Sequence, residues 1–465
     1  MGARPVGTTI AEVSGRKLSL ITVFFSNFLA KAPVTKHYES ASQMRRPLGI
    51  DLFAGAGGLS LGFEQAGFDV AAAVELDPIH AATHEFNFPS CKVLCASVAD
   101  LSGASLRKRA GLGNDEIDVV FGGAPCQGFS LMGKRALDDP RNHLVFHYVR
   151  LVQELQPKYC VFENVKGLTL GKHAQFLQEL IEALNATGYQ VLLPYRILNA
   201  ADFGVPQHRE RLFLIAARQD QALPRYPMSM PERVTVAQAI GDLPEAEQFD
   251  RLIDSDEILA HWTTQSPYAR RLRGLAIDAG DFSHPRAFDA TRLTGSLRTD
   301  HTALSRERFA STVQGKTEAV SRFHKLHPDG LCNTLRAGTD SARGAFTSAR
   351  PIHPTSPRVI TVREAARLHS YPDWFRLHAT KWHGFRQVGN SVPPLLGRAV
   401  ATELLRAMNI IPERPTALQA LGDPNLLHMN MREAAAYFSV ATTVIAQRTR
   451  RPAAVDALSP TFNLW

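Results

Sequence analysis

The stretch "DLFAGAGGLSLGF" (Asp51–Phe63) has the local pattern that best predicts the fold of this chain. It begins as a buried strand, turns through glycines and continues with apolar residues at helical spacing. The glycines permit a tight turn and a close approach of the backbone to a nucleotide-like ligand. The stretch is neither a GxGxxG dinucleotide motif nor a P-loop, since no Gly-Lys-Ser/Thr follows. Taken alone, it fits a purely structural turn equally well.

The same alternation of strand and helix extends on both sides of this stretch. Buried strands are predicted at "LGIDLFAG", "FDVAAAVEL", "CKVLCA", "IDVVFGG", "KYCVFENV" and "RLFLIAA". Helical spacing closed by glycine occurs in "GLSLGFEQAG" and "AQFLQELIEALNATG". The pattern predicts an α/β fold with a doubly wound, mostly parallel sheet.

The alternation stops after Arg218 and resumes late in the chain. A Pro-rich linker leads into an irregular stretch, which predicts a second, smaller domain of loops and short strands. "TVREAARLHSYP" predicts a helix that ends at Tyr371 before Pro372, and "QVGNSVPPLLGRAVATELLRAM" predicts a loop running into a helix that starts at its prolines. The expected parts are a poorly ordered N-terminal extension (1–46), a first domain (47–218), the linker and second domain (219–360), a return to the first domain (361–408) and a small helical C-terminal extension (409–465).

Charge and cysteine usage narrow the function classes. The 465 residues carry a net charge of +8, and residues 264–360 hold 15 Lys and Arg against 8 Asp and Glu, a net of +7. This favours a polyanionic partner, with a merely solvated basic surface as the alternative. The five cysteines are irregularly spaced, which favours a reducing compartment over a disulfide framework. Cys91 and Cys95 have no second pair, so no metal site is predicted.

Near the N-terminus, "LSLITVFFSNFLA" (Leu18–Ala30) is too short to span a bilayer and loosely mimics a signal peptide. We interpret it as an upstream extension, with Met44 as an alternative start. No membrane partner is expected.

Candidate functional residues follow the predicted strands. Glu75 ends the second strand, where an acidic residue suits ribose hydroxyls. Cys126 in "GGAPCQGFS" lies just beyond a strand, where a thiolate could act as a nucleophile, although a lone cysteine is more often a packing residue. Glu163 in "FENV" follows an apolar run, so burial should raise its pKa. In "VPQHRERLFLI", Arg209 and Arg211 share a face that could hold a phosphate or a base carbonyl, or simply be a surface pair.

In this order, the motifs resemble the conserved blocks of the DNA cytosine-5 methyltransferase family, bacterial type. The matching blocks are "DLFAGAGGLSLGF", "VELD", "GGAPCQGFS", "ENV", "QHRER", "REAARLHSYP" and "QVGNSVPP", which span about residues 47–408. The resemblance implies the fold of S-adenosylmethionine-dependent methyltransferases, with a target recognition domain in the basic stretch. It also implies that the last motif returns to the cofactor domain.

The resemblance implies the catalytic chemistry as well. The Cys126 thiolate would attack carbon 6 of a cytosine flipped out of the duplex, and carbon 5 would then accept the methyl group. Glu163 would interact with ring N3 and the exocyclic amine. Arg209 and Arg211 would hold the base and shape its pocket.

The resemblance likewise implies a set of cofactor-binding residues around S-adenosylmethionine. Most lie in the first turn and the returning segment: Phe53, Ala54, Gly55, Gly57, Gly58, Leu59, Glu75, Asp100, Pro125, Asn390, Ser391 and Val392. The sequence departs from the family at Ala124, where a proline is usual. It also leaves open whether Ser97 or Asp100 contacts the adenine amine.

Two alternatives remain at the level of sequence: a tRNA cytosine-5 methyltransferase and a non-catalytic DNA-binding relative. The long basic insert and "PCQGFS" favour DNA over tRNA. The expected partner is double-stranded DNA, bound by a monomer, with a restriction-modification or other defence system as the biological context. The expected location is the bacterial cytoplasm, on the nucleoid when DNA is bound. The DNA target site cannot be assigned from sequence.

Overall fold

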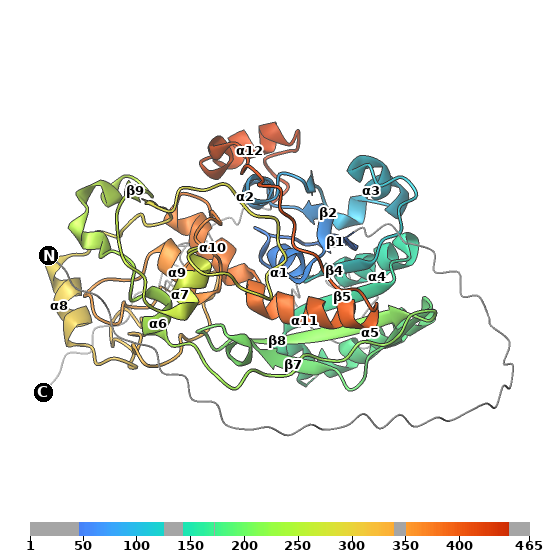
Figure 1. The fold of residues 1–465 in the computed structure, drawn as a ribbon, viewed down its shortest axis with the longest axis horizontal. Helices are drawn as coiled ribbons and strands as arrows, with labels where there is room; N and C mark the ends of the chain where they lie inside the picture. The colour runs from blue at the N-terminus through green and yellow to red at the C-terminus, as the bar shows by residue number, and fades with distance from the viewer. Residues whose placement is uncertain (1–45, 125–142, 172, 339–349, 446–465) are drawn as a thin grey trace, which may run out of the picture. The chain divides into compact units, whose positions relative to one another are not determined.

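The structure is a computed structural model that describes residues 46–124, 143–171, 173–338 and 350–445 (Figure 1). The predicted N-terminal extension, apart from Arg46, lies outside these residues, as do Pro125 and Cys126. No helix in the described ranges is long and apolar enough to cross a membrane.

The core of the molecule is an eight-stranded sheet in the order β3-β2-β1-β4-β5-β8-β6, with β7 also paired to β8. The strands are β1 (Leu48–Leu52), β2 (Asp69–Glu75), β3 (Lys92–Cys95), β4 (Val119–Gly122), β5 (Tyr159–Val165), β6 (Tyr189–Val191), β7 (Arg196–Asn199) and β8 (Glu210–Arg218). Strands β1 to β5 pair in parallel, whereas β6, β7 and β5 each pair antiparallel with β8. This confirms the predicted mostly parallel sheet and adds β6 and β7, which the sequence did not reveal.

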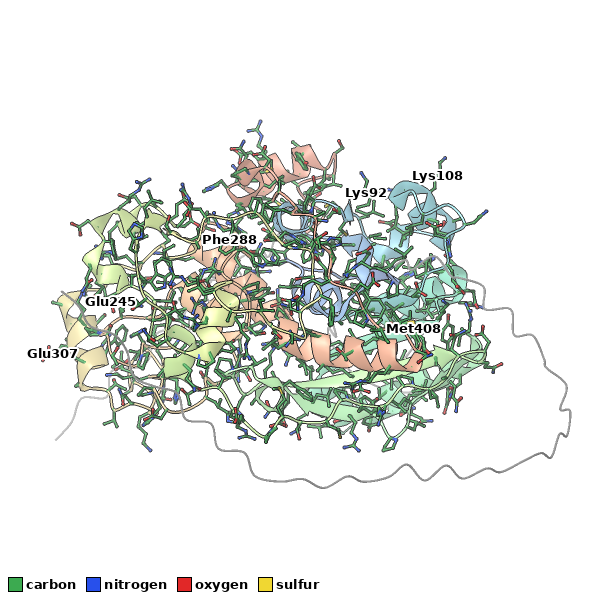
Figure 2. All side chains as sticks on the ribbon, viewed as in Figure 1. Lys92, Lys108, Glu245, Phe288, Glu307 and Met408 are labelled. Carbon is green, nitrogen blue, oxygen red and sulfur yellow. The ribbon has the colours of Figure 1, made fainter. Side chains whose placement is uncertain are left out.

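Helices cover both faces of the sheet because its buried strands are apolar on both sides. On one face, Val119, Phe121 and Phe213 pack with α1 (Gly58–Ala66) and α11 (Pro394–Ala407). The other face packs against α3 (Gly103–Ala110), α4 (His143–Leu155) and α5 (His173–Ala186). Side chains fill the space between these layers, while Lys92 and Lys108 project outward (Figure 2). The predicted doubly wound arrangement is therefore present.

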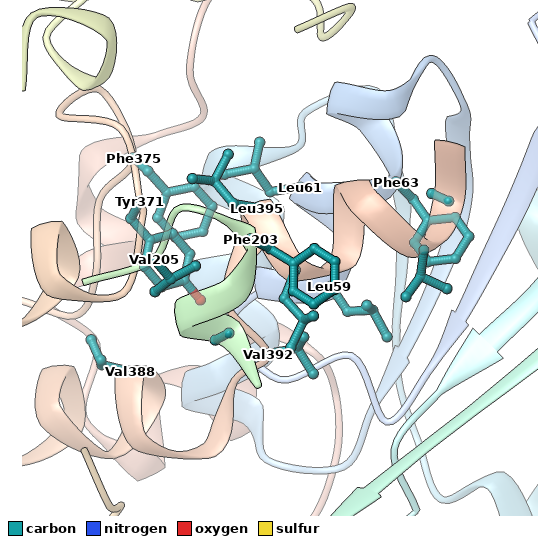
Figure 3. Packing of buried hydrophobic residues seen from close by; sticks show 14 of the residues in the cluster. Leu59, Leu61, Phe63, Phe203, Val205, Tyr371, Phe375, Val388, Val392 and Leu395 are labelled. Atoms are coloured by element: carbon teal, nitrogen blue, oxygen red, sulfur yellow. The ribbon is translucent and has the colours of Figure 1, made fainter. Parts of the chain in front are cut away.

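Helices α1 and α11 cross at a pair of glycines. A Cβ atom added to Gly62 would lie 2.6 Å from the Pro394 carbonyl oxygen and 2.8 Å from the Cα atom of Gly397. The contact brings residues far apart in the chain into one apolar cluster, which includes Leu59, Val392 and Leu395 (Figure 3). The returning segment thus packs directly on the helix that follows the first Gly-rich turn.

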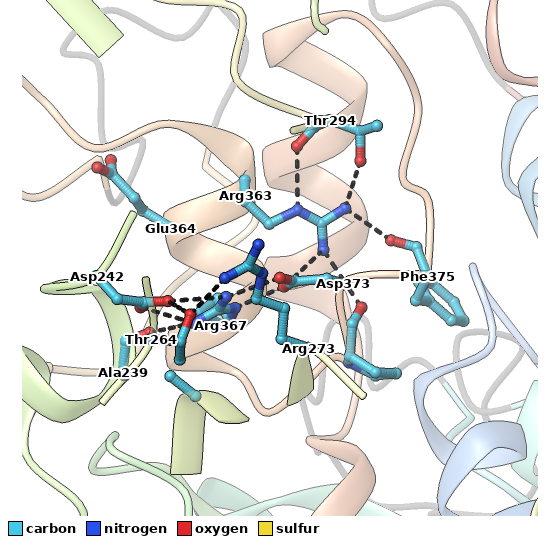
Figure 4. A network of polar contacts seen from close by, with 12 residues as sticks. Ala239, Asp242, Thr264, Arg273, Thr294, Arg363, Glu364, Arg367, Asp373 and Phe375 are labelled. Atoms are coloured by element: carbon cyan, nitrogen blue, oxygen red, sulfur yellow. Dashed lines mark hydrogen bonds and ion pairs between the residues drawn. The ribbon is translucent and has the colours of Figure 1, made fainter. Parts of the chain in front are cut away.

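The stretch between β8 and the returning segment has little regular structure. Its elements are α6 (Val236–Ile240), β9 (Ile258–Leu259), α7 (Pro267–Leu272), β10 (Arg292–Leu293) and α8 (Ala303–Ser311). A buried network connects it to α9 (Val362–Leu368) (Figure 4). In this network Arg367 is paired with Asp242 and Asp373, and the Arg363 guanidinium donates to the carbonyl and hydroxyl oxygens of Thr294.

Two details of the returning segment differ from the sequence prediction. Helix α9 ends at Leu368 rather than Tyr371, because Ser370 adopts a left-handed φ of 65° that a helix cannot continue through. The predicted loop at "QVGN" is instead the last turn of α10 (Lys381–Asn390). Helix α11 begins at Pro394, as expected from the prolines. In the C-terminal extension, α12 (Met431–Tyr437) packs near α2 (Pro78–Asn87).

Candidate active site at the carboxyl edge of the sheet

A cavity of about 680 Å³ lies at the carboxyl edge of the sheet, where β1 and β4 meet. The chain runs from β1 outward through β2 and β3 and then returns to β4, so this is the switch point at which open α/β sheets bind ligands. The lining includes most of the predicted cofactor residues, namely Phe53, Ala54, Gly55, Gly58, Leu59, Glu75, Asn390, Ser391 and Val392. Segments separated by more than half the chain therefore share one wall.

The Gly-rich turn is locked onto Glu75. The Gly55 amide donates to Glu75 Oε2 at 2.7 Å, and the Asp77 amide donates to Glu75 Oε1 at 2.8 Å. Phe53 and Gly55 both have positive φ, 68° and 56°, which bends the chain away from β1. Burial raises the pKa of Glu75. The acidic side chain therefore shapes the turn in addition to facing the cavity.

Two predicted cofactor residues are not part of the described lining. A Cβ atom added to Gly57 would lie 2.3 Å from the Phe88 ring, so this glycine is needed for packing against the end of α2. Asp100 is exposed at the end of a 3-10 turn, whereas Ser97, at the start of that turn, lines the cavity. Of the two residues that the sequence leaves open for the adenine contact, Ser97 is the one that lines the cavity.

Glu163 and Arg211 form a buried ion pair inside the cavity. Arg211 Nε lies 2.8 Å from Glu163 Oε1, and the two side chains are 13% and 12% exposed. Glu163 pairs with Phe213 across the antiparallel β5–β8 ladder, so Arg211, two residues from Phe213, shares its face. Burial raises the pKa of Glu163, and the Arg211 charge opposes that shift. The pair offers a carboxyl group and a guanidinium to a planar polar ligand.

Arg209 lies in the same wall, and its two terminal nitrogens bond to the backbone. Its terminal nitrogens donate to the carbonyl oxygens of Leu335 at 2.8 Å, Gly389 at 2.8 Å and Ser391 at 2.7 Å. The side chain is 1% exposed. Arg209 thus holds Leu335, in the basic stretch, against the returning segment, while its contact with the base stays a prediction.

The predicted nucleophile Cys126 lies outside the described residues, but the chain leading to it is described. Asn164, in the "ENV" motif, donates from Nδ2 to the Ala124 carbonyl oxygen at 2.9 Å. A Cβ atom added to Gly123 would lie 2.4 Å from Glu163 Oε2, so the loop approaches that carboxyl group closely. The four described cysteines are buried and free, and burial raises the pKa of Cys95 and of Cys160 to about 12. Such thiols are poor nucleophiles.

Asp51, the last polar residue of β1, also lines the cavity, and the sequence reasoning missed it. Burial raises its pKa to about 8, a 2.6 Å hydrogen bond from the Ser60 hydroxyl opposes the shift, and the nearby charge of Glu75 adds to it. The position of Asp51 directly before the Gly-rich turn was a signal that could have identified it. Within the described residues no group of three or more His, Cys, Asp or Glu side chains is arranged to hold a metal ion.

Comparisons with known proteins point to one family. The family model of the C-5 cytosine-specific DNA methylases matches residues 48–406. The chain is 63% identical to the Type II methyltransferase M.XorII of Xanthomonas oryzae pv. oryzae over 413 residues, which covers 88% of this chain and 97% of that protein. It is 35% identical to the Type II methyltransferase M1.HphI of Haemophilus parahaemolyticus, covering 77% of this chain and 86% of that one.

A solved structure agrees with the sequence relatives. The crystal structure of a prophage-encoded E. coli protein described as a DNA modification methyltransferase matches with a TM-score of 0.65 and 34% identity. It covers 78% of this chain and 99% of that one. With a cavity at the switch point and a family match over most of its length, the chain belongs to the C-5 cytosine-specific DNA methylases and is a DNA cytosine-5 methyltransferase.

Proposed function

We propose that the enzyme binds S-adenosylmethionine in the cavity beside β1 and β2 and holds a flipped-out cytosine against Glu163 and Arg211. The observation that carries this proposal is that a single cavity contains both the buried Glu163–Arg211 pair and the Gly-rich turn fixed by Glu75. The methyl donor and the base would therefore meet in one cavity.

The residues of the cavity fit the cofactor. Gly55 is open, with nothing within 4 Å of an added Cβ atom, while the same atom on Gly58 would lie 2.5 Å from the Val392 carbonyl oxygen. The α1 N-terminus favours a carboxylate, and the carboxyl group of Glu75 suits the ribose hydroxyls. A volume of about 680 Å³ is suited to a ligand of this size. When bound, S-adenosylmethionine supplies an electrophilic methyl group.

The chain's own residues would perform the remaining steps. The Cys126 thiolate would add to carbon 6 of cytosine, and the electron pair of the 5,6 double bond would move to carbon 5. Carbon 5 would form the bond to the methyl group as the methyl–sulfur bond breaks, with S-adenosylhomocysteine as the leaving group. Glu163 holds ring N3 and the exocyclic amine, where its raised pKa favours a proton shared with N3. Loss of the carbon 5 proton to water and of the thiolate from carbon 6 restores the aromatic ring.

We further propose that residues 219–360 act as the target recognition domain and that the enzyme belongs to a Type II restriction-modification system in a bacterial cytoplasm. The net charge of +7 over residues 264–360 supports a DNA-binding role. The relatives named as Type II methyltransferases support the biological context. That the match is to DNA methylases favours duplex DNA over tRNA.

The proposal is tested by incubating the protein with labelled S-adenosylmethionine and either duplex DNA or tRNA. Label is expected in DNA, and label in tRNA alone would overturn the DNA assignment. Cys126→Ala should abolish transfer while the affinity for S-adenosylhomocysteine, measured by calorimetry, stays unchanged. Cys95→Ala, at a buried thiol of the β3 edge, is the matched control and should retain activity. Methylation by Cys126→Ala would show that Cys126 is not the nucleophile.

A further inference from the structure

The C-terminal extension lies outside the family match, yet it docks beside the cofactor cavity. The family match ends at residue 406, whereas the described chain continues to Ile445. Leu426 and Leu427 are buried against Ala82 and Phe86 of α2. Figure 1 shows α12 next to α2, in agreement with the contacts between them. The extension is therefore a packed part of this edge of the molecule.

Several polar contacts fix the extension in place. The Gly422 amide donates to the Phe86 carbonyl oxygen at 2.8 Å, and an added Cβ atom at Gly422 would lie 2.9 Å from the Cα atom of Phe86. The Tyr437 hydroxyl donates to Glu85 Oε1 at 2.5 Å. The Ala379 amide donates to the Leu427 carbonyl oxygen at 3.0 Å. These bonds tie the extension both to α2 and to the returning segment.

The end of α12 turns the chain toward the sheet. Ser439 adopts a left-handed φ of 56°, and the Val440 amide donates back to the Ala435 carbonyl oxygen at 2.9 Å, which is the Schellman pattern. Val440 then packs on Val93 and Cys95 of β3, the edge strand. The chain therefore approaches the carboxyl edge of the sheet from the β3 side.

Five residues later, Ile445 lines the cofactor cavity. The residues that follow β2 and β3, including Leu76 and Ser97, line the same cavity. Leu76 is 36% exposed, which leaves an apolar surface open at this side. Glu163 and Arg211 lie on β5 and β8, across β1 and β4 from this edge. Ile445 thus belongs to the side of the cavity that carries Glu75, and not to the side that carries the Glu163–Arg211 ion pair.

We infer that the C-terminal extension completes the cofactor site and that Ile445 supplies an apolar contact to the adenosine half of S-adenosylmethionine. The inference rests on the proposed function, because that function places the ribose at Glu75. The aliphatic side chain would cover apolar surface of the nucleoside and exclude water from it. The extension is then a binding element for the methyl donor, added to the shared family domain.

The test is the affinity of the full chain for S-adenosylhomocysteine and for 5′-methylthioadenosine, measured by isothermal titration calorimetry. Ile445→Ala should weaken both ligands by about three- to tenfold, since both contain the adenosine group and the side chain loses buried methyl and methylene groups. Ile445→Leu, which conserves volume, should restore most of the affinity. Ile411→Ala is the matched control, because Ile411 lies in the same extension and is 88% exposed.

Each outcome has a distinct meaning. Unchanged affinity of Ile445→Ala, or an equal loss in Ile411→Ala, overturns the inference while the proposed function stands. A loss seen with S-adenosylhomocysteine but not with 5′-methylthioadenosine overturns the assignment to the adenosine half. Failure of the wild-type protein to bind either ligand would overturn the proposed cofactor site and this inference together. The melting temperature and the affinity for duplex DNA should be the same in all three variants as in the wild type.

Discussion

The surroundings of Glu163 determine both the pKa of its carboxyl group and the orientation of its side chain. Its carboxyl group is buried, which raises its pKa, and Arg211 at 2.8 Å restrains that shift and fixes the orientation of the side chain. A glutamate on an exposed strand end would have neither property. The neighbouring Arg209 bonds three backbone carbonyls, so two arginines of one short motif have different roles.

At this scale, Glu163→Gln should lower kcat by about 100-fold or more, because glutamine cannot transfer or share a proton with ring N3. The affinity for duplex DNA should change little, because the amide keeps the size of the side chain. Methyl transfer under saturating DNA and donor is the measurement. Glu210→Gln, at the start of β8 and 46% exposed, is the control and should remain near wild-type activity. Full activity of Glu163→Gln would contradict the assigned role.

Helices α1 and α11 cross at a point where both helices need a glycine. The helices approach closely only because Gly62 and Gly397 have no side chains at the crossing. α1 carries the Gly-rich turn at its N-terminus, and Asn390, Ser391 and Val392 lie just before α11. The crossing therefore sets the distance between two walls of the cavity at the carboxyl edge of the sheet.

At the crossing of α1 and α11, Gly62→Ala should destabilise the protein by about 1–3 kcal/mol, because the added Cβ atom overlaps the backbone of α11. Chemical denaturation measures this loss, and calorimetry should show weaker S-adenosylhomocysteine binding as the walls separate. Gly167→Ala is the control, since its added Cβ atom would meet only the Val165 side chain, at 3.9 Å. Equal stability of the two variants would argue against the tight crossing.

Across the whole molecule, buried arginines connect the irregular middle stretch to the returning segment. Arg358 donates to both oxygens of Glu364, at 2.9 and 2.8 Å, and from Nε to Glu245 at 2.6 Å. Burial alone would raise the pKa of Glu364, but the charges of Arg358 and His353, together with hydrogen bonds from Arg358 and the Thr361 amide, outweigh it and lower that pKa to about 2. Because the folded pKa lies below the ordinary value of 4.5, Glu364 contributes stability above pH 4.5 that is lost as the pH falls toward 2.

The expected result is a stability gap between wild type and Glu364→Gln that depends on pH. At pH 7 the variant should be less stable by about 3–5 kcal/mol, since buried Arg358 loses one of its two carboxylate partners and keeps only Glu245. The gap should shrink between pH 4.5 and pH 2 as the wild-type carboxylate takes up a proton. Urea unfolding at a series of pH values measures both. Glu307→Gln, at an exposed position, is the control and should show no such dependence on pH. A stability difference between wild type and Glu364→Gln that stays the same at every pH would contradict the role of the Glu364 carboxylate.

Much of this molecule could be predicted from its sequence, because strand and helix periodicity and glycine placement are local properties. The parallel strands, α1, α5 and the start of α11 all follow from such patterns. Strands β6 and β7 were missed because they are short and are stabilised by pairing with β8. Helix α9 ends earlier than its sequence predicts, because the left-handed turn at Ser370 comes before Pro372.

The family blocks and the residue types of the site follow from the order of motifs along the chain. Which of those residues face the cavity depends on how distant segments pack together. This packing places Ser97 there and Asp100 outside, turns Gly57 toward Phe88, binds Arg209 to backbone carbonyls and adds Asp51 and Ile445 to the wall. A local pattern could not show these contacts, because the partners of a side chain can lie far along the chain, as for Arg209, whose carbonyl partners are 126 to 182 residues away.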